Sequence, residues 1–135
     1  MNQKRRILVA DDADAVTTVL ATALEVNGFE VVVTDNGQEA LRLAMTDDFD
    51  LAIIDQLMPG MLGIEVLQKI RYSLSEMPVI ILSGVDDDEV VVGSLRAGAA
   101  DFVRKPFRLA ELVARIEKHL PVLASNPQPD ADLTR

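Results

Sequence analysis

The sequence contains no cysteine and no tryptophan, and histidine and tyrosine occur once each. The absence of cysteine excludes disulfide bonds, thiolate catalysis and zinc–thiolate sites. No apolar run reaches the roughly 18 residues of a membrane-span candidate. The apolar stretch Ile7–Ala10, which follows a basic N-terminus, is too short for the core of a signal peptide. We therefore expect a cytoplasmic protein that does not associate with a membrane.

Positive charge is also scarce, because 13 lysines and arginines face 22 aspartates and glutamates, for a net charge of −9. Nucleic-acid binding needs a cationic surface that neutralises phosphates. We therefore expect that this domain does not bind nucleic acid on its own. The length of 135 residues and the hydrophobic content of 49% indicate one globular domain with a substantial core.

Short apolar runs alternate with segments of helical periodicity. Several runs are β-branched and nearly continuous, as in parallel strands that are covered on both faces. The expected strands are Arg6–Ala10, Glu30–Thr34, Leu51–Asp55, Val79–Ser83 and Asp101–Arg104. The expected helices are about 14–27, 38–45, 64–72, 87–97 and 109–120. This alternation predicts an α/β fold, a doubly wound five-stranded parallel sheet with helices on both faces.

Local signals add detail at the ends of these elements. Asp14 is expected to cap the first helix. His119, the only histidine, lies in the last turn of the last helix, where we expect it to be solvated and without a catalytic or metal-binding role. The segment 122–135 lacks periodicity and is rich in proline and aspartate. It is expected to be a disordered tail or linker, which leaves 1–121 as the folded domain.

Polar residues follow or end four of the expected strands. Asp11 and Asp12 follow the first, Asp55 ends the third, Ser83 ends the fourth and Lys105 follows the fifth. The carboxyl ends of parallel strands meet at one edge of the sheet, where functional residues gather. Three carboxylates at one edge repel one another unless a cation or a proton intervenes. This combination predicts a divalent metal and a reactive carboxylate.

The order and spacing of these residues resemble the receiver domain of bacterial two-component response regulators. The resemblance covers about Arg5 to Leu120 and implies a flavodoxin-like (βα)5 fold with strand order 2-1-3-4-5. The segments that carry it are Ile7-Leu8-Val9-Ala10-Asp11-Asp12, Asp55 with Met58-Pro59-Gly60, Ile80-Ile81-Leu82-Ser83, Ala97-Gly98-Ala99 and Asp101-Phe102-Val103-Arg104-Lys105-Pro106-Phe107.

The resemblance implies that Asp55 accepts a phosphoryl group from the phosphohistidine of a histidine kinase or a phosphotransfer protein. It also implies a Mg²⁺ ion, a hard cation that takes oxygen ligands. The implied ligands are Asp12, Asp55 and the main-chain carbonyl of Leu57, with Asp11 binding the ion through water. Lys105 is implied to pair with the phosphoryl group as a point charge, and its peptide bond to the following proline is implied to be cis.

The implied switch consists of Ser83 and Phe102. The hydroxyl of Ser83 would donate to the phosphoryl group, and the ring of Phe102 would turn into the space that Ser83 vacates. The surface of the fourth helix, fifth strand and fifth helix would then change and alter the binding of a downstream protein. The domain would act as a monomer or a phosphorylation-dependent dimer. It would catalyse only its own phosphorylation and dephosphorylation, so it is not expected to be an enzyme.

The fourth helix contains Val90-Val91-Val92-Gly93, which is poor helix chemistry, since glycine costs roughly 1 kcal/mol against alanine. Our hypothesis is that this helix is the weakest element and moves on activation.

Three other functions remain open. A haloacid-dehalogenase-type phosphatase needs a second acid two residues after its nucleophile, where this chain has Leu57. A flavodoxin-like mononucleotide binder needs phosphate donors in its first loop, where Asp11 and Asp12 would repel phosphate. A receiver that works as an unphosphorylated interaction module is disfavoured, though not excluded, by the intact set of site residues.

Overall fold

The computed structural model describes residues 4–73, 75–84 and 87–120. The expected tail, 122–135, lies outside this range. The strands are β1 (Arg6–Ala10), β2 (Glu30–Thr34), β3 (Leu51–Asp55), β4 (Val79–Ser83) and β5 (Asp101–Arg104). The helices are α1 (Asp14–Val26), α2 (Gly37–Thr46), α3 (Gly63–Tyr72), α4 (Asp88–Arg96) and α5 (Leu109–His119). The strand bounds match the prediction, and each helix end lies within one residue of it.

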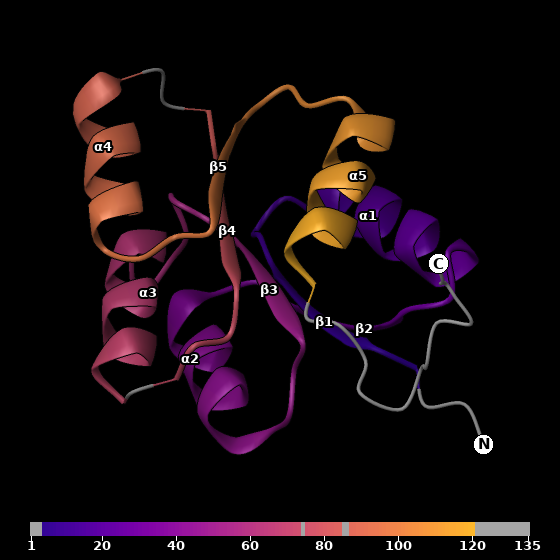
Figure 1. The fold of residues 1–135 in the computed structure, drawn as a ribbon, viewed down its shortest axis with the longest axis horizontal. Coiled ribbons are helices and arrows are strands. Elements are labelled where there is room, and N and C mark those ends of the chain that lie inside the picture. The colour runs from indigo at the N-terminus through magenta and orange to yellow at the C-terminus, as the bar shows by residue number, and fades with distance from the viewer. Residues whose placement is uncertain (1–3, 74, 85–86, 121–135) are drawn as a thin grey trace, which may run out of the picture.

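The five strands form one parallel sheet in the order β2-β1-β3-β4-β5. Helices α1 and α5 cover one face, and α2, α3 and α4 cover the other (Figure 1). The alternating side chains of the central strands therefore enter two separate apolar layers. The layer under α1 and α5 includes Ile7, Val9, Leu20, Leu24, Ile53 and Leu112. The layer under α2 and α3 includes Leu8, Ala40, Ile54, Leu67, Ile70 and Ile81. Both predictions for the sheet, its parallel strands and their order, are confirmed.

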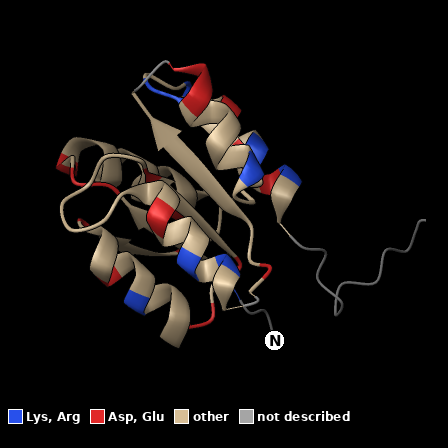
Figure 2. Cartoon of the chain, turned by 90° about the vertical axis from the view of Figure 1, so that its left-hand side faces the viewer, with Lys and Arg blue, Asp and Glu red and all other residues tan. Residues whose placement is uncertain are grey.

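Strands β3 and β4 are buried along their whole length, which explains their continuous apolar sequence. Charged residues lie mainly on the helices and loops around the sheet (Figure 2). Within the described residues, no helix has both the length and the apolar character needed to cross a membrane.

The prediction that Asp14 caps α1 is wrong. Asp14 is the first helical residue, and the N-cap is Ala13, whose side chain has no oxygen to offer. The carboxylate that serves this turn is that of Asp11, whose Oδ1 accepts a hydrogen bond of 2.9 Å from the backbone N–H of Ala13. Asp11 thus binds the N–H of the N-cap residue itself, and not the N–H groups of the first helical turn that a capping side chain would bind.

Candidate functional site

The carboxyl edge of the sheet brings together the polar residues that the sequence places at its strand ends. Asp55 is the last residue of β3, which lies between β1 and β4. In the register of β1 and β3, Ala10 pairs with Ile54, so Asp11 emerges next to Asp55. Ser83 ends β4 and is 1% exposed. Three adjacent strands therefore contribute to one site.

Lys105, just after β5, reaches across the sheet edge to two of the acids. Its Nζ lies 2.8 Å from Oδ2 of Asp11 and 3.1 Å from Oδ1 of Asp55. The peptide bond between Lys105 and Pro106 is cis, as the family resemblance implied. The backbone N–H of Lys105 donates to the carbonyl of Ser83 at 2.8 Å, which extends the pairing of β4 and β5 beyond the last residue of β5. This hydrogen bond holds the backbone of Lys105 against β4, while the ammonium group of its side chain contacts Asp11 and Asp55.

The acid cluster fits a divalent cation that prefers oxygen ligands. Asp11, Asp12 and Asp55 each offer one carboxylate oxygen, and these oxygens lie within 4.8 Å of one another. Asp11 and Asp55 are buried, whereas Asp12 is exposed and leaves the cluster open to solvent. Among the described residues, the buried Oδ2 of Asp11 has no hydrogen bond of good geometry, and its contact with Lys105 is an ion pair. A set of oxygen donors that includes a buried carboxylate oxygen without a hydrogen bond, Oδ2 of Asp11, is suited to a hard cation such as Mg²⁺.

Burial and like charge raise the pKa of Asp55. Burial is the largest cause, and repulsion from Asp11 adds to it, while the contact with Lys105 acts in the opposite direction without cancelling them. For Lys105, burial favours the neutral form, but the contacts with Asp11 and Asp55 outweigh it and raise the pKa above its usual value. The lysine therefore stays cationic, and one ammonium group serves two buried carboxylates.

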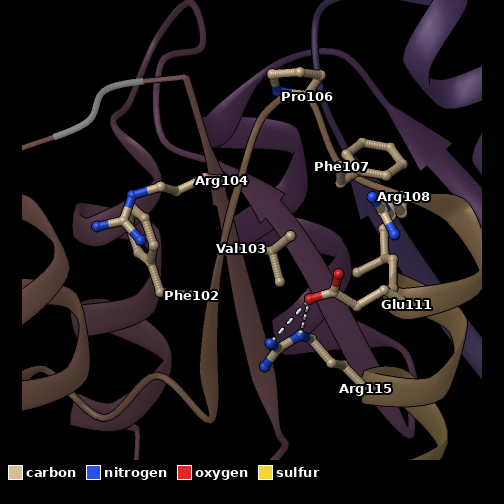
Figure 3. A pocket seen from close by; sticks show the side chains of 9 residues that line it. Phe102, Val103, Arg104, Pro106, Phe107, Arg108, Glu111 and Arg115 are labelled. Carbon is tan, nitrogen blue, oxygen red and sulfur yellow. Dashed lines mark hydrogen bonds and ion pairs between the residues drawn. The ribbon is translucent and has the colours of Figure 1, made fainter.

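The residues expected to form the switch lie on β4, which is next to β3, and on the edge strand β5. Phe102 is half-buried and packs against the apolar layer under α2 and α3. It lies on the same side of β5 as Arg104 and on the opposite side from Val103 (Figure 3). Ser83 lies on the neighbouring strand, where its register partner is Arg104. Leu57 follows the site in the loop after β3, and its side chain is 55% exposed.

A family model described as the response regulator receiver domain matches residues 7–117 of the chain. The chain belongs to this family. Among its relatives, the response regulator MprA of Mycolicibacterium vanbaalenii is 40% identical over 111 residues, which are 82% of this chain and 48% of that protein. The uncharacterized transcriptional regulatory protein YkoG of Bacillus subtilis is 38% identical over 118 residues, which are 87% of this chain and 52% of YkoG. This receiver domain thus spans about half the length of these relatives.

Solved receiver structures agree with this assignment over nearly their whole length. The receiver domain of the Francisella response regulator 1452 superposes with a TM-score of 0.82 at 36% identity, covering 86% of this chain and 96% of that one. The chemotaxis response regulator CheY4 of Vibrio cholerae gives a TM-score of 0.79 at 27% identity, covering 87% of this chain and 100% of that one. Receiver domains are signalling switches of two-component systems, so the fold and the general role are both assigned.

One cluster in this receiver domain escaped the sequence analysis. The carboxylate of Asp101 on β5 binds the guanidinium of Arg115 at 3.0 Å and the ring of His119 at 3.1 Å, both from α5. Burial by itself would raise the pKa of Asp101, but hydrogen bonds from Arg115, His119 and the Phe102 amide hold it below its usual range. The expectation that His119 is solvated is therefore wrong. The signal that could have revealed the contact is the i, i+4 spacing of Arg115 and His119, which places both on one face of α5.

Proposed function

We propose that this receiver domain is a phosphorylation-dependent switch in which Asp55 is the phosphoacceptor. The observation that supports this proposal is the contact of one ammonium group with two buried carboxylates: Lys105 Nζ lies 3.1 Å from Asp55 and 2.8 Å from Asp11. Transfer of a phosphoryl group needs positive charge fixed around the transferred oxygens. A nucleophilic carboxylate with a lysine and a metal-binding set beside it meets that need.

The proposed donor is a phosphohistidine on a histidine kinase or a phosphotransfer protein. A carboxylate oxygen of Asp55 attacks the phosphorus, and the new O–P bond forms as the N–P bond of the donor breaks. The electron pair of the broken bond stays on the imidazole nitrogen, which then takes up a proton. Asp55 becomes an acyl phosphate, and Lys105 pairs with the phosphoryl oxygens through charge-assisted hydrogen bonds.

The carboxylates of Asp11, Asp12 and Asp55 and the main-chain carbonyl of Leu57 are the groups that we expect to hold Mg²⁺. The bound ion would supply positive charge to the carboxylate cluster and to the phosphoryl oxygens. Because Asp12 is exposed and Asp11 is buried, the ion would enter from the side of Asp12. Oδ1 of Asp11 already accepts from Ala13, so Oδ2, the oxygen in ion-pair contact with Lys105, is the oxygen of that side chain that would face the ion.

Ser83 and Phe102 are the groups that we expect to report phosphorylation. Ser83 is buried at the end of β4 and Phe102 is half-buried on β5, so a shift of the Ser83 hydroxyl toward phosphorylated Asp55 changes the space available on β5. A new inward position of the Phe102 ring would alter the α4–β5–α5 surface. The downstream partner is a protein that distinguishes the two states of that surface.

The test is phosphorylation by acetyl phosphate in the presence of Mg²⁺, followed by mass spectrometry of the intact protein. We expect the wild-type domain to gain one phosphoryl group, and Asp55→Asn to gain none. Asp48→Asn removes an exposed carboxylate and serves as the matched control, which should be phosphorylated like the wild type. A folded wild-type protein that gains no phosphoryl mass would refute the proposal and favour an unphosphorylated interaction module.

A further inference from the structure

The residue after Asp55 makes more tertiary contacts than its place in a loop suggests. Gln56 is only 7% exposed. Its backbone N–H donates to the carbonyl of Leu82 on β4 at 2.8 Å, and its own carbonyl accepts from the N–H of Gly63 at 2.9 Å. Its side-chain Oε1 accepts from the N–H of Ile64, also at 2.9 Å. Gln56 therefore joins β4 and the first turn of α3 to the position next to Asp55.

Helix α3 needs these acceptors because its own N-cap residue cannot supply one. The first N–H groups of a helix have no partners within the helix. The N-cap is Leu62, whose side chain carries no oxygen. The carboxylate of Glu65 accepts from the N–H of Leu62 at 2.9 Å, but the N–H groups of Gly63 and Ile64 still require outside partners. Gln56 supplies both of them, one with its backbone and one with its side chain.

The same hydrogen bonds join the two ends of the segment 57–62, because Gln56 precedes the segment and Gly63 and Ile64 follow it. This segment begins with Leu57, whose carbonyl is an expected metal ligand, and it ends at α3. At Gly63 the helix lies directly against the end of β3, because a Cβ there would be 2.5 Å from the carbonyl oxygen of Asp55. Strand and helix are thus in contact at the base of the segment, and Gln56 is the residue that bonds them together.

We propose that Gln56 is a positioning residue for the metal site: it holds the segment 57–62 so that the carbonyl of Leu57 stays beside the three carboxylates. This inference rests on the proposed function, because metal binding by Leu57 is part of it. Groups that orient metal ligands without touching the metal change its affinity by about 10–100-fold when they are removed. The side-chain amide of Gln56 acts in this way, through the backbone of the residue that follows it.

The test compares three proteins by calorimetric titration with Mg²⁺ alone: the wild type, Gln56→Met, and Gln56→Met with Leu62→Ser. Methionine keeps the length of the side chain but has no carbonyl acceptor. Serine at position 62 returns an acceptor to the first turn of α3 from the N-cap, without a link to position 56. We expect Gln56→Met to raise the Kd for Mg²⁺ about tenfold. We expect the double variant to recover the thermal midpoint but not the Mg²⁺ affinity.

Phosphorylation by acetyl phosphate separates metal binding from the chemical step. In Gln56→Met, the rate should fall at low Mg²⁺ and return to the wild-type rate at saturating Mg²⁺. Unchanged Mg²⁺ affinity in Gln56→Met, or recovery of that affinity in the double variant, would overturn the inference and leave Gln56 as a helix cap only. If Gln56→Met alone does not fold, the double variant is compared with Leu62→Ser instead. Failure of the wild type to bind Mg²⁺ would instead refute the metal site of the proposed function.

Discussion

Replacing Asp55 by asparagine should stabilise the metal-free domain, although it removes the proposed phosphoacceptor. Asp55 is 5% exposed, and its carboxylate lies within 4.8 Å of those of Asp11 and Asp12. Lys105 provides one positive charge against these three negative charges. Asparagine has nearly the same shape and can still accept a hydrogen bond from the lysine, so the substitution changes mainly the charge.

The distances allow a rough size for this effect. With an effective dielectric constant of about 20, each carboxylate pair at 4.8 Å costs about 3.5 kcal/mol. On the same scale, the contact of Asp55 with Lys105 at 3.1 Å contributes about 5 kcal/mol of attraction. The two repulsions exceed the attraction by about 2 kcal/mol, burial of the carboxylate adds to this, and solvent around exposed Asp12 reduces it. We therefore expect Asp55→Asn to raise the free energy of unfolding by about 1–3 kcal/mol at pH 7.

The gain in stability of Asp55→Asn over the wild type should increase as the pH rises. Burial, followed by repulsion from Asp11, raises the pKa of Asp55 above its ordinary value. The folded domain then binds this proton more tightly than the unfolded chain does. The contribution of Asp55 to wild-type stability therefore falls as pH rises from the ordinary carboxyl range through the raised pKa. Asp55→Asn lacks this loss, so its advantage should be small at about pH 3 and complete above the raised pKa.

Urea denaturation followed by circular dichroism, at low salt and with a chelator present, measures this difference across the pH range. Asp48→Asn, which removes an exposed carboxylate, is the control and should change stability by less than about 0.5 kcal/mol. The reasoning is refuted if Asp55→Asn is no more stable than the wild type at pH 7. It is also refuted if the gain persists unchanged in acid.

Two further predictions concern glycine. Gly63→Ala should destabilise the domain by about 1–3 kcal/mol in urea denaturation, because the added methyl group would lie 2.5 Å from the carbonyl oxygen of Asp55. Gly84→Ala, which meets nothing within 4 Å, is its control, and equal stability of the two variants would contradict the prediction. Gly93→Ala should add about 0.5–1 kcal/mol, since its methyl group would make only an ordinary contact of 3.7 Å with Ile64. It should also slow hydrogen exchange in α4; exchange there that is already as slow as in β3 would disprove the hypothesis that α4 is the weakest element.

Sequence patterns were sufficient for the central strands because each is a short apolar run that is covered by helices on both faces. In β3 and β4 every residue is buried. A short, continuously apolar run of this kind is typical of a parallel strand that is covered on both faces. The strand order could not be predicted in this way, because periodicity does not say which strands are neighbours. It followed from the resemblance to receiver domains, and the sheet then confirmed it.

The errors concern side chains whose partners are set by tertiary contacts. The sequence pattern favoured Asp14 as the cap of α1, but the N-cap is Ala13, whose N–H donates to the side chain of Asp11. His119 has the sequence context of a solvated residue at the end of a helix. It contacts Asp101 instead, because α5 packs beside β5 on the sheet. A local pattern cannot report a contact between residues that are 18 positions apart.

The sequence by itself determined where the acids, the serine and the lysine lie relative to the strands, because the apolar runs end at those residues. Only the tertiary structure decided that Lys105 contacts Asp11 and Asp55 together, and that the side chain of Gln56 turns inward to α3. The physical reason is the range of the interactions. Strand formation depends on a local apolar pattern, whereas an ion pair or a cap across the sheet depends on how whole elements pack.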